Sequence, residues 1–312
     1  FKAISERLVE KGIATLRYDF RGVFCNKRSL NCENCSPKER QEKYISTCFD
    51  NRIRQTVTPQ SQTEDLFQVY QLAQNHPKVK PNSIVAFGHS EGSLHFARLY
   101  KHQAITPKAF IFIGGLAESP SSVVQWQIVD RMVDGIVEMD MDKDGKTTNE
   151  EIAENYSNSL LSLFPLKSLL SPNGYWTEES ILKQQHVSYE AVREQALTAE
   201  DSAPYPPSGP LVQASQKWWK MFFVDSDPVI NDLNGFEGPI IYHNGDADSQ
   251  TNFNRQIKFI ENARREYGLP VSVVRHEGAG HGLGKHPTLG PISNDGMNRL
   301  IESIVSAALA NP

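Results

Sequence analysis

Ser90 lies at the centre of a pentapeptide, Gly88-His89-Ser90-Glu91-Gly92, whose residue types suit nucleophilic attack on a carbonyl carbon. The apolar residues 83–88 before it predict a strand, and residues 92–102 after it predict a helix. In Gly-x-Ser-x-Gly between a strand and a helix, the serine occupies a sharp, strained turn that exposes its hydroxyl at the helix N-terminus. We therefore predict that Ser90 is a nucleophile.

Two further segments offer the base and the acid that a serine nucleophile requires. A predicted buried strand, residues 239–243, ends in a polar turn with Asp246 and Asp248, and strand 271–276 precedes a glycine-flanked loop with His281. We assign the acid to Asp248 because its position leaves more loop to reach a histidine. Asp246 is the alternative acid; without that role it would be a turn-capping or solvated carboxylate. The flanking glycines let the ring of His281 reach the nucleophile, so His281 is the predicted base. The other nearby histidines are expected to be structural: His89, His243, His276 and His286.

These side chains need a scaffold that brings distant segments to one edge of a sheet. Predicted strands alternate with predicted helices, which indicates an α/β fold with a parallel sheet and right-handed crossovers. The candidate residues follow the carboxyl ends of strands, where open α/β sheets place their sites. The predicted strands span residues 13–20, 83–88, 109–114, 239–243 and 271–276, and the predicted helices around them span residues 1–12, 64–74, 92–102, 253–267 and 295–310.

The chain resembles the α/β-hydrolases, in particular their esterase and serine-aminopeptidase-like branch. The resemblance is carried by residues 16–22 (Leu-Arg-Tyr-Asp-Phe-Arg-Gly), Gly88-His89-Ser90-Glu91-Gly92, Gly245-Asp246-Ala247-Asp248 and Gly278-Ala279-Gly280-His281-Gly282. The chain order of serine, acid and histidine is also that of the family. The resemblance covers most of the chain outside two insertions. It implies Ser90 as nucleophile, Asp248 as acid, His281 as base and the backbone N–H of Glu91 as the first oxyanion donor.

The resemblance also indicates a gap at the start of the chain. The family takes a second oxyanion N–H from a loop after an earlier strand, and no segment here supplies that loop. Residues 1–12 resemble the helix that follows the loop, and residues 13–20 resemble the next strand. We therefore expect a fragment that lacks the first strands and any targeting peptide. The missing oxyanion donor would be worth roughly 3–4 kcal/mol of barrier.

All four cysteines, Cys25, Cys32, Cys35 and Cys48, fall within a polar insertion at residues 23–60. Two disulfides in an oxidising compartment fit this cluster, because the rest of the chain contains no stray thiol. A zinc site is the alternative: Cys32 and Cys35 have the spacing of a zinc knuckle, but Cys25 and Cys48 do not form a second close pair. We favour disulfides and leave their pairing open among three connectivities.

Residues 140–151 match the twelve-position EF-hand calcium loop. The predicted ligands are the carboxylates of Asp140, Asp142 and Asp144, the backbone carbonyl of Lys146, Thr148 through water, and Glu151 bidentately. Helices are predicted on both sides, at residues 123–138 and 152–164. No second loop is visible, so we expect a structural Ca²⁺ site of modest affinity that extracellular calcium would fill. A solvated acidic turn and a dockerin-like repeat are the alternatives.

The composition argues against several classes of function. The 312 residues carry a net charge of −5, which disfavours nucleic acid as a partner. No apolar run has the length of a transmembrane helix, and no redox or nucleotide cofactor is implied. The clustered cysteines and the calcium loop together indicate an extracellular or periplasmic location. The oligomeric state is not indicated.

The chain is predicted to be a hydrolase core interrupted by a helical cap. Residues 1–115 form the first part of the core, residues 116–237 the cap with the calcium loop, and residues 238–312 the second part of the core. A cap at this place would cover Ser90. Its aromatic pair Trp218 and Trp219 is more consistent with packing of a cap helix than with an acyl pocket.

The predicted function is hydrolysis of a small ester or thioester through an acyl-enzyme. A serine peptidase or aminopeptidase that acts on short peptides is the first alternative. A non-catalytic, calcium-dependent binding module is the second.

Overall fold

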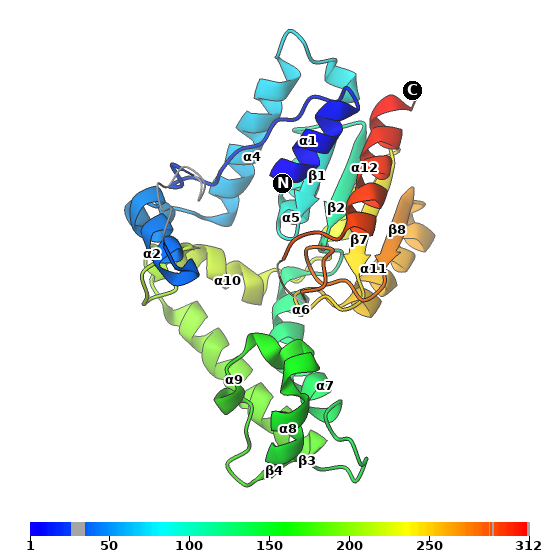
Figure 1. Ribbon diagram of the computed structural model, residues 1–312. Coiled ribbons are helices and arrows are strands. Elements are labelled where there is room, and N and C mark those ends of the chain that lie inside the picture. The colour runs from blue at the N-terminus through cyan, green and yellow to red at the C-terminus, as the bar shows by residue number, and fades with distance from the viewer. Residues whose placement is uncertain (26–34, 287, 289, 311–312) are drawn as a thin grey trace.

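The computed structural model describes residues 1–25, 35–286, 288 and 290–310. Its centre is a four-stranded parallel sheet in the order β1 (Val85–His89), β2 (Ala109–Ile113), β7 (Ile240–Gly245) and β8 (Val271–His276) (Figure 1). The prediction of an α/β fold with a parallel sheet flanked by helices is therefore confirmed. All residues of β2 are buried, which explains its uninterrupted apolar sequence.

Helices cover both faces of this sheet. α1 (Lys2–Glu10) and α12 (Asn294–Leu309) share a core with Ile111 of β2 on one face. Phe110 and Phe112, the neighbours of Ile111, point to the other face because side chains alternate along a strand. They join a larger core to which α4 (Pro59–Gln74), α5 (Gly92–Lys101) and α11 (Phe253–Tyr267) contribute.

Residues 13–20, predicted as a strand, are not part of the sheet. They have no regular secondary structure, and Leu16, Tyr18 and Phe20 are 55%, 40% and 52% exposed. A strand needs a neighbour that satisfies its N–H and C=O groups. No strand of the described chain lies beside this segment, so β1 is an edge strand there and pairs with β2 alone.

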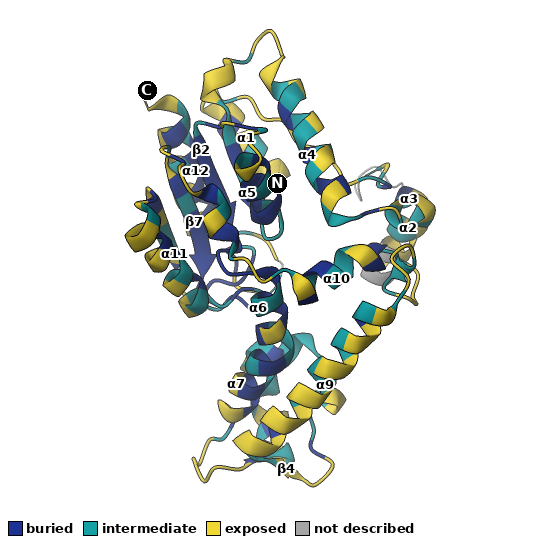
Figure 2. Cartoon of the chain, turned by 180° about the vertical axis from the view of Figure 1, so that it is seen from behind, coloured by how far each residue is buried: buried dark blue, intermediate teal, exposed yellow. Residues whose placement is uncertain are grey.

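A helical region follows β2 and occupies the span predicted for the cap. It contains α6 (Pro120–Gln125), the π-helix η3 (Trp126–Asp130), α7 (Arg131–Val137), α8 (Asn149–Asn155), α9 (Glu178–Thr198) and α10 (Gln216–Val224). The part with α7, α8 and α9 projects away from the sheet (Figure 1), and much of α9 is exposed (Figure 2). This projecting part has a small apolar core of its own, which includes Ile136, Ile152 and Leu161.

Short elements complete the described chain. They are α2 (Pro37–Cys48), α3 (Asn51–Arg54), the 3₁₀ turns η2 (Pro81–Ser83), η4 (Tyr156–Asn158), η5 (Leu160–Leu163), η6 (Leu166–Ser168) and η7 (Val229–Leu233), and the two-stranded pairs β3 (Thr147–Thr148) with β4 (Tyr175–Trp176) and β5 (Pro204–Tyr205) with β6 (Ala214–Ser215). None of the described helices is both long and apolar enough to cross a membrane.

A disulfide joins Cys25 to Cys48 within the polar insertion. Cys35 is disulfide-bonded as well. Cys32, the fourth cysteine of the predicted disulfides, lies outside the described residues. A sulfur in a disulfide is not available as a thiolate ligand, so the Cys25–Cys48 bond counts against the zinc alternative for these two residues.

Candidate active site

Ser90 lies directly after β1, on the turn that leads into α5. Its φ of +55° is in the left-handed region, which residues with a side chain seldom adopt. A Cβ on Gly88 would lie 2.9 Å from the carbonyl carbon of Gly92, so strand and helix approach each other closely at this turn. The Ser90 N–H donates to the carbonyl of Ile113 (2.9 Å), and the hydroxyl of Ser93 donates to the carbonyl of Ser90 (2.7 Å). The turn is thus held from both sides.

Asp248 lies on the turn after β7 with a fully buried side chain. Its Oδ1 accepts hydrogen bonds from the N–H groups of Gln250 (2.6 Å) and Thr251 (3.0 Å). Its Oδ2 accepts a bond from the hydroxyl of Thr251 (2.8 Å). These donors replace the water that the carboxylate loses on burial.

His281 lies in the loop after β8 and is 4% exposed. Its Nδ1 is 2.8 Å from Asp248 Oδ2. Because the carboxylate can only accept, His281 donates its Nδ1–H and keeps Nε2 available as a base. A Cβ at Gly114, which follows β2 with φ +51°, would lie 2.6 Å from His281 Nδ1. Only a glycine at that position leaves room for the imidazole.

Ser90 and His281 come together at the end of β2. The carbonyl of Ile113 binds the Ser90 N–H, and the next residue, Gly114, contacts the imidazole of His281. The ring of His89 is also close, with its centre 4.7 Å from that of His281. Within the described residues, however, the Ser90 hydroxyl makes no hydrogen bond to His281. The contact between Asp248 and His281 is therefore formed, and a hydrogen bond between Ser90 and His281 is not.

Asp246, the alternative acid, has other partners. Its Oδ2 accepts hydrogen bonds from Arg275 Nε (2.9 Å) and Nη2 (2.7 Å), and its Oδ1 accepts one from the Gly278 N–H (2.7 Å). This carboxylate joins the end of β7 to the start of the loop that carries His281. It has the turn-capping role that the sequence offered as the alternative for it.

Of the neighbouring histidines, His243 and His276 are buried and His89 is partly buried, and all three are held in their neutral form. Burial, with the adjacent His281, lowers the pKa of His89 to about 4. Burial lowers the pKa of His243 to about 3 and that of His276 to about 4. His243 Nδ1 lies 3.0 Å from His276 Nε2, and His243 Nε2 lies 3.0 Å from the hydroxyl of Ser303. These contacts tie β7, β8 and α12 together, so they support the site without entering it.

The helical region after β2 reaches the turn of Ser90 through α10. Trp218 Nε1–H donates to Glu91 Oε1 (2.6 Å), and the same oxygen lies 3.3 Å from His95 Nε2. Glu91 is the N-cap residue of α5, whose first N–H groups have no partner inside the helix. Trp218 therefore anchors the residue predicted to donate to the oxyanion. Sequence reasoning missed this contact because 127 residues separate the two side chains.

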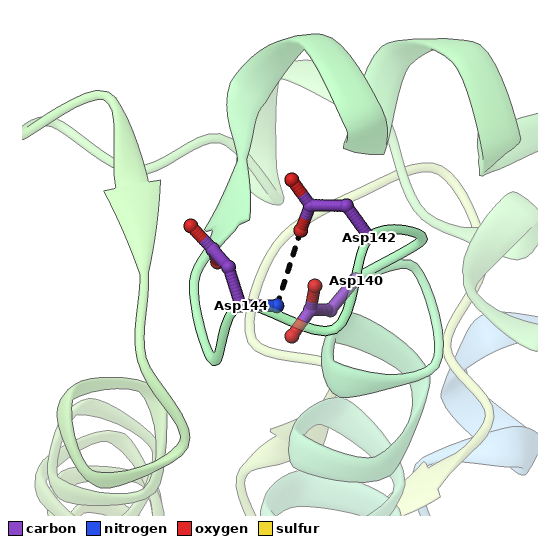
Figure 3. Close-up of side chains that lie close together, drawn as sticks. All are labelled: Asp140, Asp142 and Asp144. Carbon is purple, nitrogen blue, oxygen red and sulfur yellow. Dashed lines mark hydrogen bonds between the residues drawn. The ribbon is translucent and has the colours of Figure 1, made fainter.

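The predicted calcium loop brings three aspartates together (Figure 3). One oxygen each from Asp140, Asp142 and Asp144 lie within 4.8 Å of one another, an arrangement that could hold a metal ion. The carboxylates also shape the loop. Asp140 accepts from the N–H of Gly145 (2.9 Å), Asp142 from that of Asp144 (3.1 Å), and Asp144 from that of Lys146 (2.7 Å). Gly145 makes the sharp turn with φ +84°.

Glu151, the last of the predicted ligands, is not part of this cluster. Glu151 accepts hydrogen bonds from the N–H of Met141 (3.0 Å) and from the N–H and hydroxyl of Thr148 (2.9 and 2.8 Å), and it caps α8. The side chain of Lys146 extends over the ring of Tyr175, 5.3 Å from its centre. Thr147 and Thr148 pair with β4, in the place where an EF-hand pairs with a second hand. Beyond the aspartates, the described residues do not support an EF-hand.

The helices predicted on the two sides of the loop are corrected by the structure. The region 123–138 is helical but passes from α6 through the π-helix η3 into α7. The predicted helix 152–164 ends at Asn155. The side chain of Ser159 accepts from the N–H of Leu161 and starts a separate 3₁₀ turn, and serine and asparagine favour such local bonds over a continued helix.

Comparison with known proteins gives a distant structural likeness. The α/β-hydrolase GrgF from Penicillium sp. sh18 is 12% identical, with a TM-score of 0.41 over 83% of this chain and 75% of that chain. Est1E from Butyrivibrio proteoclasticus is 10% identical, with a TM-score of 0.40 over 80% and 69%. The structure of DcsB in complex with its substrate analogue is 12% identical, with a TM-score of 0.42 over 92% and 87%. No protein-family model and no curated protein matches the sequence. A likeness at this level assigns neither a family nor an activity.

Proposed function

We propose that this chain is a serine hydrolase of the α/β-hydrolase type, which cleaves an ester or thioester through Ser90, His281 and Asp248. The observation that supports this proposal most is the buried pair of His281 Nδ1 and Asp248 Oδ2, 2.8 Å apart, beside the turn of Ser90. A carboxylate that orients an imidazole next to a serine on a strained turn provides the parts that acyl transfer needs.

The reaction would proceed through an acyl-enzyme. His281 Nε2 removes the hydroxyl proton while Ser90 Oγ bonds to the carbonyl carbon, and the carbonyl electrons move onto its oxygen. The Glu91 N–H stabilises that oxyanion. His281 then gives its proton to the leaving alcohol or thiol as the bond to carbon breaks. In the second half, His281 takes a proton from water as the water oxygen bonds to the acyl carbon. The bond between that carbon and Ser90 Oγ then breaks, His281 returns the proton to Oγ, and the acid leaves. Asp248 stays ionised and stabilises the imidazolium.

An ester is favoured over a peptide on chemical grounds. An alcohol leaves the tetrahedral intermediate more readily than an amine, so the site has to lower the barrier less for an ester than for a peptide. A peptidase would also need acidic groups near Ser90 to hold a peptide amine. The acidic cap residues Glu178 and Glu179 are exposed in the first turn of α9, and Asp201 is paired with Lys220 (2.7 Å).

The test compares short p-nitrophenyl esters with aminoacyl p-nitroanilides, using the purified chain. We expect ester hydrolysis that falls by roughly 10⁶-fold in Ser90→Ala, because the nucleophile is lost, and by about 10⁴-fold in Asp248→Asn, because the imidazole loses its orienting acceptor. Ser83→Ala, at an exposed serine just before β1, is the matched control and should keep full activity. Ester hydrolysis that survives in Ser90→Ala contradicts the proposal, and hydrolysis of the anilides alone favours the peptidase.

We also propose that residues 140–151 bind a structural Ca²⁺ ion. The carboxylates of Asp140, Asp142 and Asp144 are hard oxygen donors of the kind that Ca²⁺ prefers. Asp140 Oδ1 is buried without a hydrogen-bond partner in the described chain, which fits an oxygen that faces a cation. Glu151, whose carboxylate is not part of the aspartate cluster here, would join the shell on binding, together with Thr148 and the carbonyl of Lys146. The ion would tie α7 and α8 to the β3–β4 pair.

Calcium binding of this kind should raise the melting temperature, because a ligand that binds only the folded state stabilises it. The gain is about 2.7 kcal/mol when free Ca²⁺ is a hundredfold above its Kd. Asp140→Ala should abolish the difference between calcium and a chelator, whereas Glu150→Gln, at an exposed residue of α8 that is not a predicted ligand, should keep it. Equal melting temperatures for the unmodified chain under both conditions would contradict the site.

We propose an extracellular or periplasmic location on the same basis. The Cys25–Cys48 disulfide is stable in an oxidising compartment, and a calcium site of modest affinity is filled where calcium is near millimolar. The check is fractionation of the source cells. Recovery of the chain in the reducing cytosol with free thiols would contradict this location.

A further inference from the structure

Two side chains of the cap contact the loop that follows Asp248. Gln127 belongs to the π-helix η3, and Arg131 begins α7 four residues later. Gln127 Nε2–H donates to the carbonyl of Gln250 (2.7 Å), and Arg131 Nη1–H donates to the carbonyl of Ser249. The two donors therefore hold successive carbonyls of one short loop.

The same two peptide groups bind Asp248 through their other ends. The carbonyl of Ser249 shares a peptide plane with the N–H of Gln250, and the carbonyl of Gln250 shares one with the N–H of Thr251. Both N–H groups donate to Asp248 Oδ1, at 2.6 and 3.0 Å. A trans peptide is planar, with its N–H and C=O pointing in opposite directions. A donor that holds the oxygen therefore also aims the N–H at the carboxylate, and it strengthens that bond by polarising the peptide.

Arg131 also places a positive charge beside the loop that follows Asp248. It is 7% exposed, with its guanidinium carbon 5.6 Å from the ring centre of Trp126 and 5.1 Å from that of Phe164. Burial lowers the pKa of Arg131 to about 10, and the charge of Asp248 acts in the opposite direction. The side chain stays cationic at neutral pH. A buried cation is costly without an anion nearby, and Asp248 is the anion that acts on it here.

We infer that Arg131, assisted by Gln127, is a positioning residue: it orients the two peptide groups that hold Asp248 and so couples the seating of the cap to the acid–base pair. Arg131 acts through the loop and does not touch the reacting atoms. The catalytic part of this inference rests on the proposed function, because the proposed function assigns Asp248 to the triad. Its structural content, the control of the Asp248–His281 hydrogen bond, can be measured without any turnover.

The primary test is the downfield proton resonance of His281 Nδ1–H, assigned by its loss in Asp248→Ala. We expect Arg131→Met to shift or broaden this resonance, Gln127→Leu to do so less, and Arg131→Lys to restore part of it. Lys108→Met is the matched control, since Lys108 also donates to backbone carbonyls, those of Ala308 and Ala310, at the opposite end of β2. That variant should leave the resonance unchanged. A resonance that is unchanged in folded Arg131→Met overturns the inference. If Arg131→Met does not fold, unchanged resonances in both Gln127→Leu and Arg131→Lys overturn it.

A double-mutant cycle gives the kinetic readout. Arg131→Met should lower kcat/KM for an ester by roughly 10²-fold, mainly in kcat, because a small misplacement of a catalytic group has an effect of that size. In an Asp248→Ala background the same substitution should change kcat/KM less than about twofold, because the group it acts through is gone. Equal losses in both backgrounds indicate a general structural role and overturn the inference. Absence of Ser90-dependent turnover in the unmodified chain contradicts the proposed function alone, and the resonance then decides the inference.

Discussion

Ser90 holds a left-handed backbone conformation that costs on the order of 1 kcal/mol for a residue with a side chain. Such a conformation persists only where its surroundings determine it. Here the Ser90 N–H is bound by Ile113, and the Ser90 carbonyl by Ser93, which in turn accepts the Leu116 N–H (2.8 Å). The segment after β2 therefore helps to support the turn of Ser90, although no catalytic role is proposed for it.

Gly88 and Gly92 flank this turn but have different surroundings. A Cβ on Gly88 would meet the backbone of Gly92 at 2.9 Å, whereas nothing lies within 4 Å of a Cβ on Gly92. We predict that Gly88→Ala lowers the free energy of unfolding by about 1–3 kcal/mol, because backbone atoms must move apart. Gly92→Ala, the matched control, should change it by less than about 0.5 kcal/mol. Urea unfolding measures both, and equal stabilities of the two variants would contradict the close approach of β1 and α5.

Residue types at the site were predictable where a local pattern implies chemistry. Gly-x-Ser-x-Gly between two elements pointed to Ser90, and the glycine-rich loop pointed to His281. The role of each remains a prediction. The contacts that distinguish Asp248 from Asp246 were not predictable. The hydrogen bond from the Thr251 hydroxyl to Asp248 and the ion pair of Arg275 with Asp246 both depend on how the loops pack. The contacts of Gln127 and Arg131 likewise cross about 120 residues of sequence and leave no spacing pattern.

Two buried histidines connect β7 and β8 beneath the site. His243 of β7 contacts His276 of β8 and Ser303 of α12, so one hydrogen-bonded chain links two strands and a helix. Burial first lowers the pKa of His243 to about 3, with His276 and Arg299 adding to the effect. Burial and Arg299 lower the pKa of His276 to about 4, and Asp295 opposes them.

These shifts predict that acid destabilises the fold. The unfolded chain binds protons at histidine below about pH 6.5, whereas the folded chain does not until about pH 4. Since the unfolded state then holds more protons, the free energy of unfolding falls as pH drops through that window. We expect the urea midpoint to decline between pH 7 and 4.5, and less steeply in His276→Gln. His186→Gln, at an exposed histidine of α9, should keep the original slope. A flat profile for the unmodified chain would contradict the prediction.

Secondary structure was predictable wherever burial produces a regular pattern. The four strands of the sheet lie within two residues of their predicted ends, and α11 spans its predicted residues. Residues 13–20 have a strand-like composition but no described strand to pair with. The helix expected after the aspartate loop is broken by local serine and asparagine bonding. In residues 13–20, strand formation depends on a pairing partner distant in the sequence. After the aspartate loop, side-chain capping outweighs helix propensity.

Across the molecule, the helical region at residues 116–237 is attached to the rest of the chain at both of its ends. After β2, Arg255 of α11 binds Glu118 and Asp130 (3.0 Å each), and the side chain of Glu118 is fully buried. At the other end, Trp218 of α10 binds Glu91, and Arg98 of α5 pairs with Asp225. Trp218 thus contacts the residue next to Ser90, and Arg255 belongs to the helix that follows the turn of Asp248. The long insertion after residues 109–114, together with the resemblance to α/β-hydrolases, predicted a helical cap at this place but not the ion pairs that hold this region. Its role as a cap stays a prediction.

The central claim, that Ser90 is a nucleophile activated by His281, is tested most directly by covalent labelling. The folded chain is treated with a fluorophosphonate probe, digested, and the modified peptide is identified by mass spectrometry. Modification at Ser90, abolished in Ser90→Ala and slowed by orders of magnitude in His281→Ala, is the result we predict. Failure of the native chain to react, or modification of a different serine while Ser90 stays free, would contradict it.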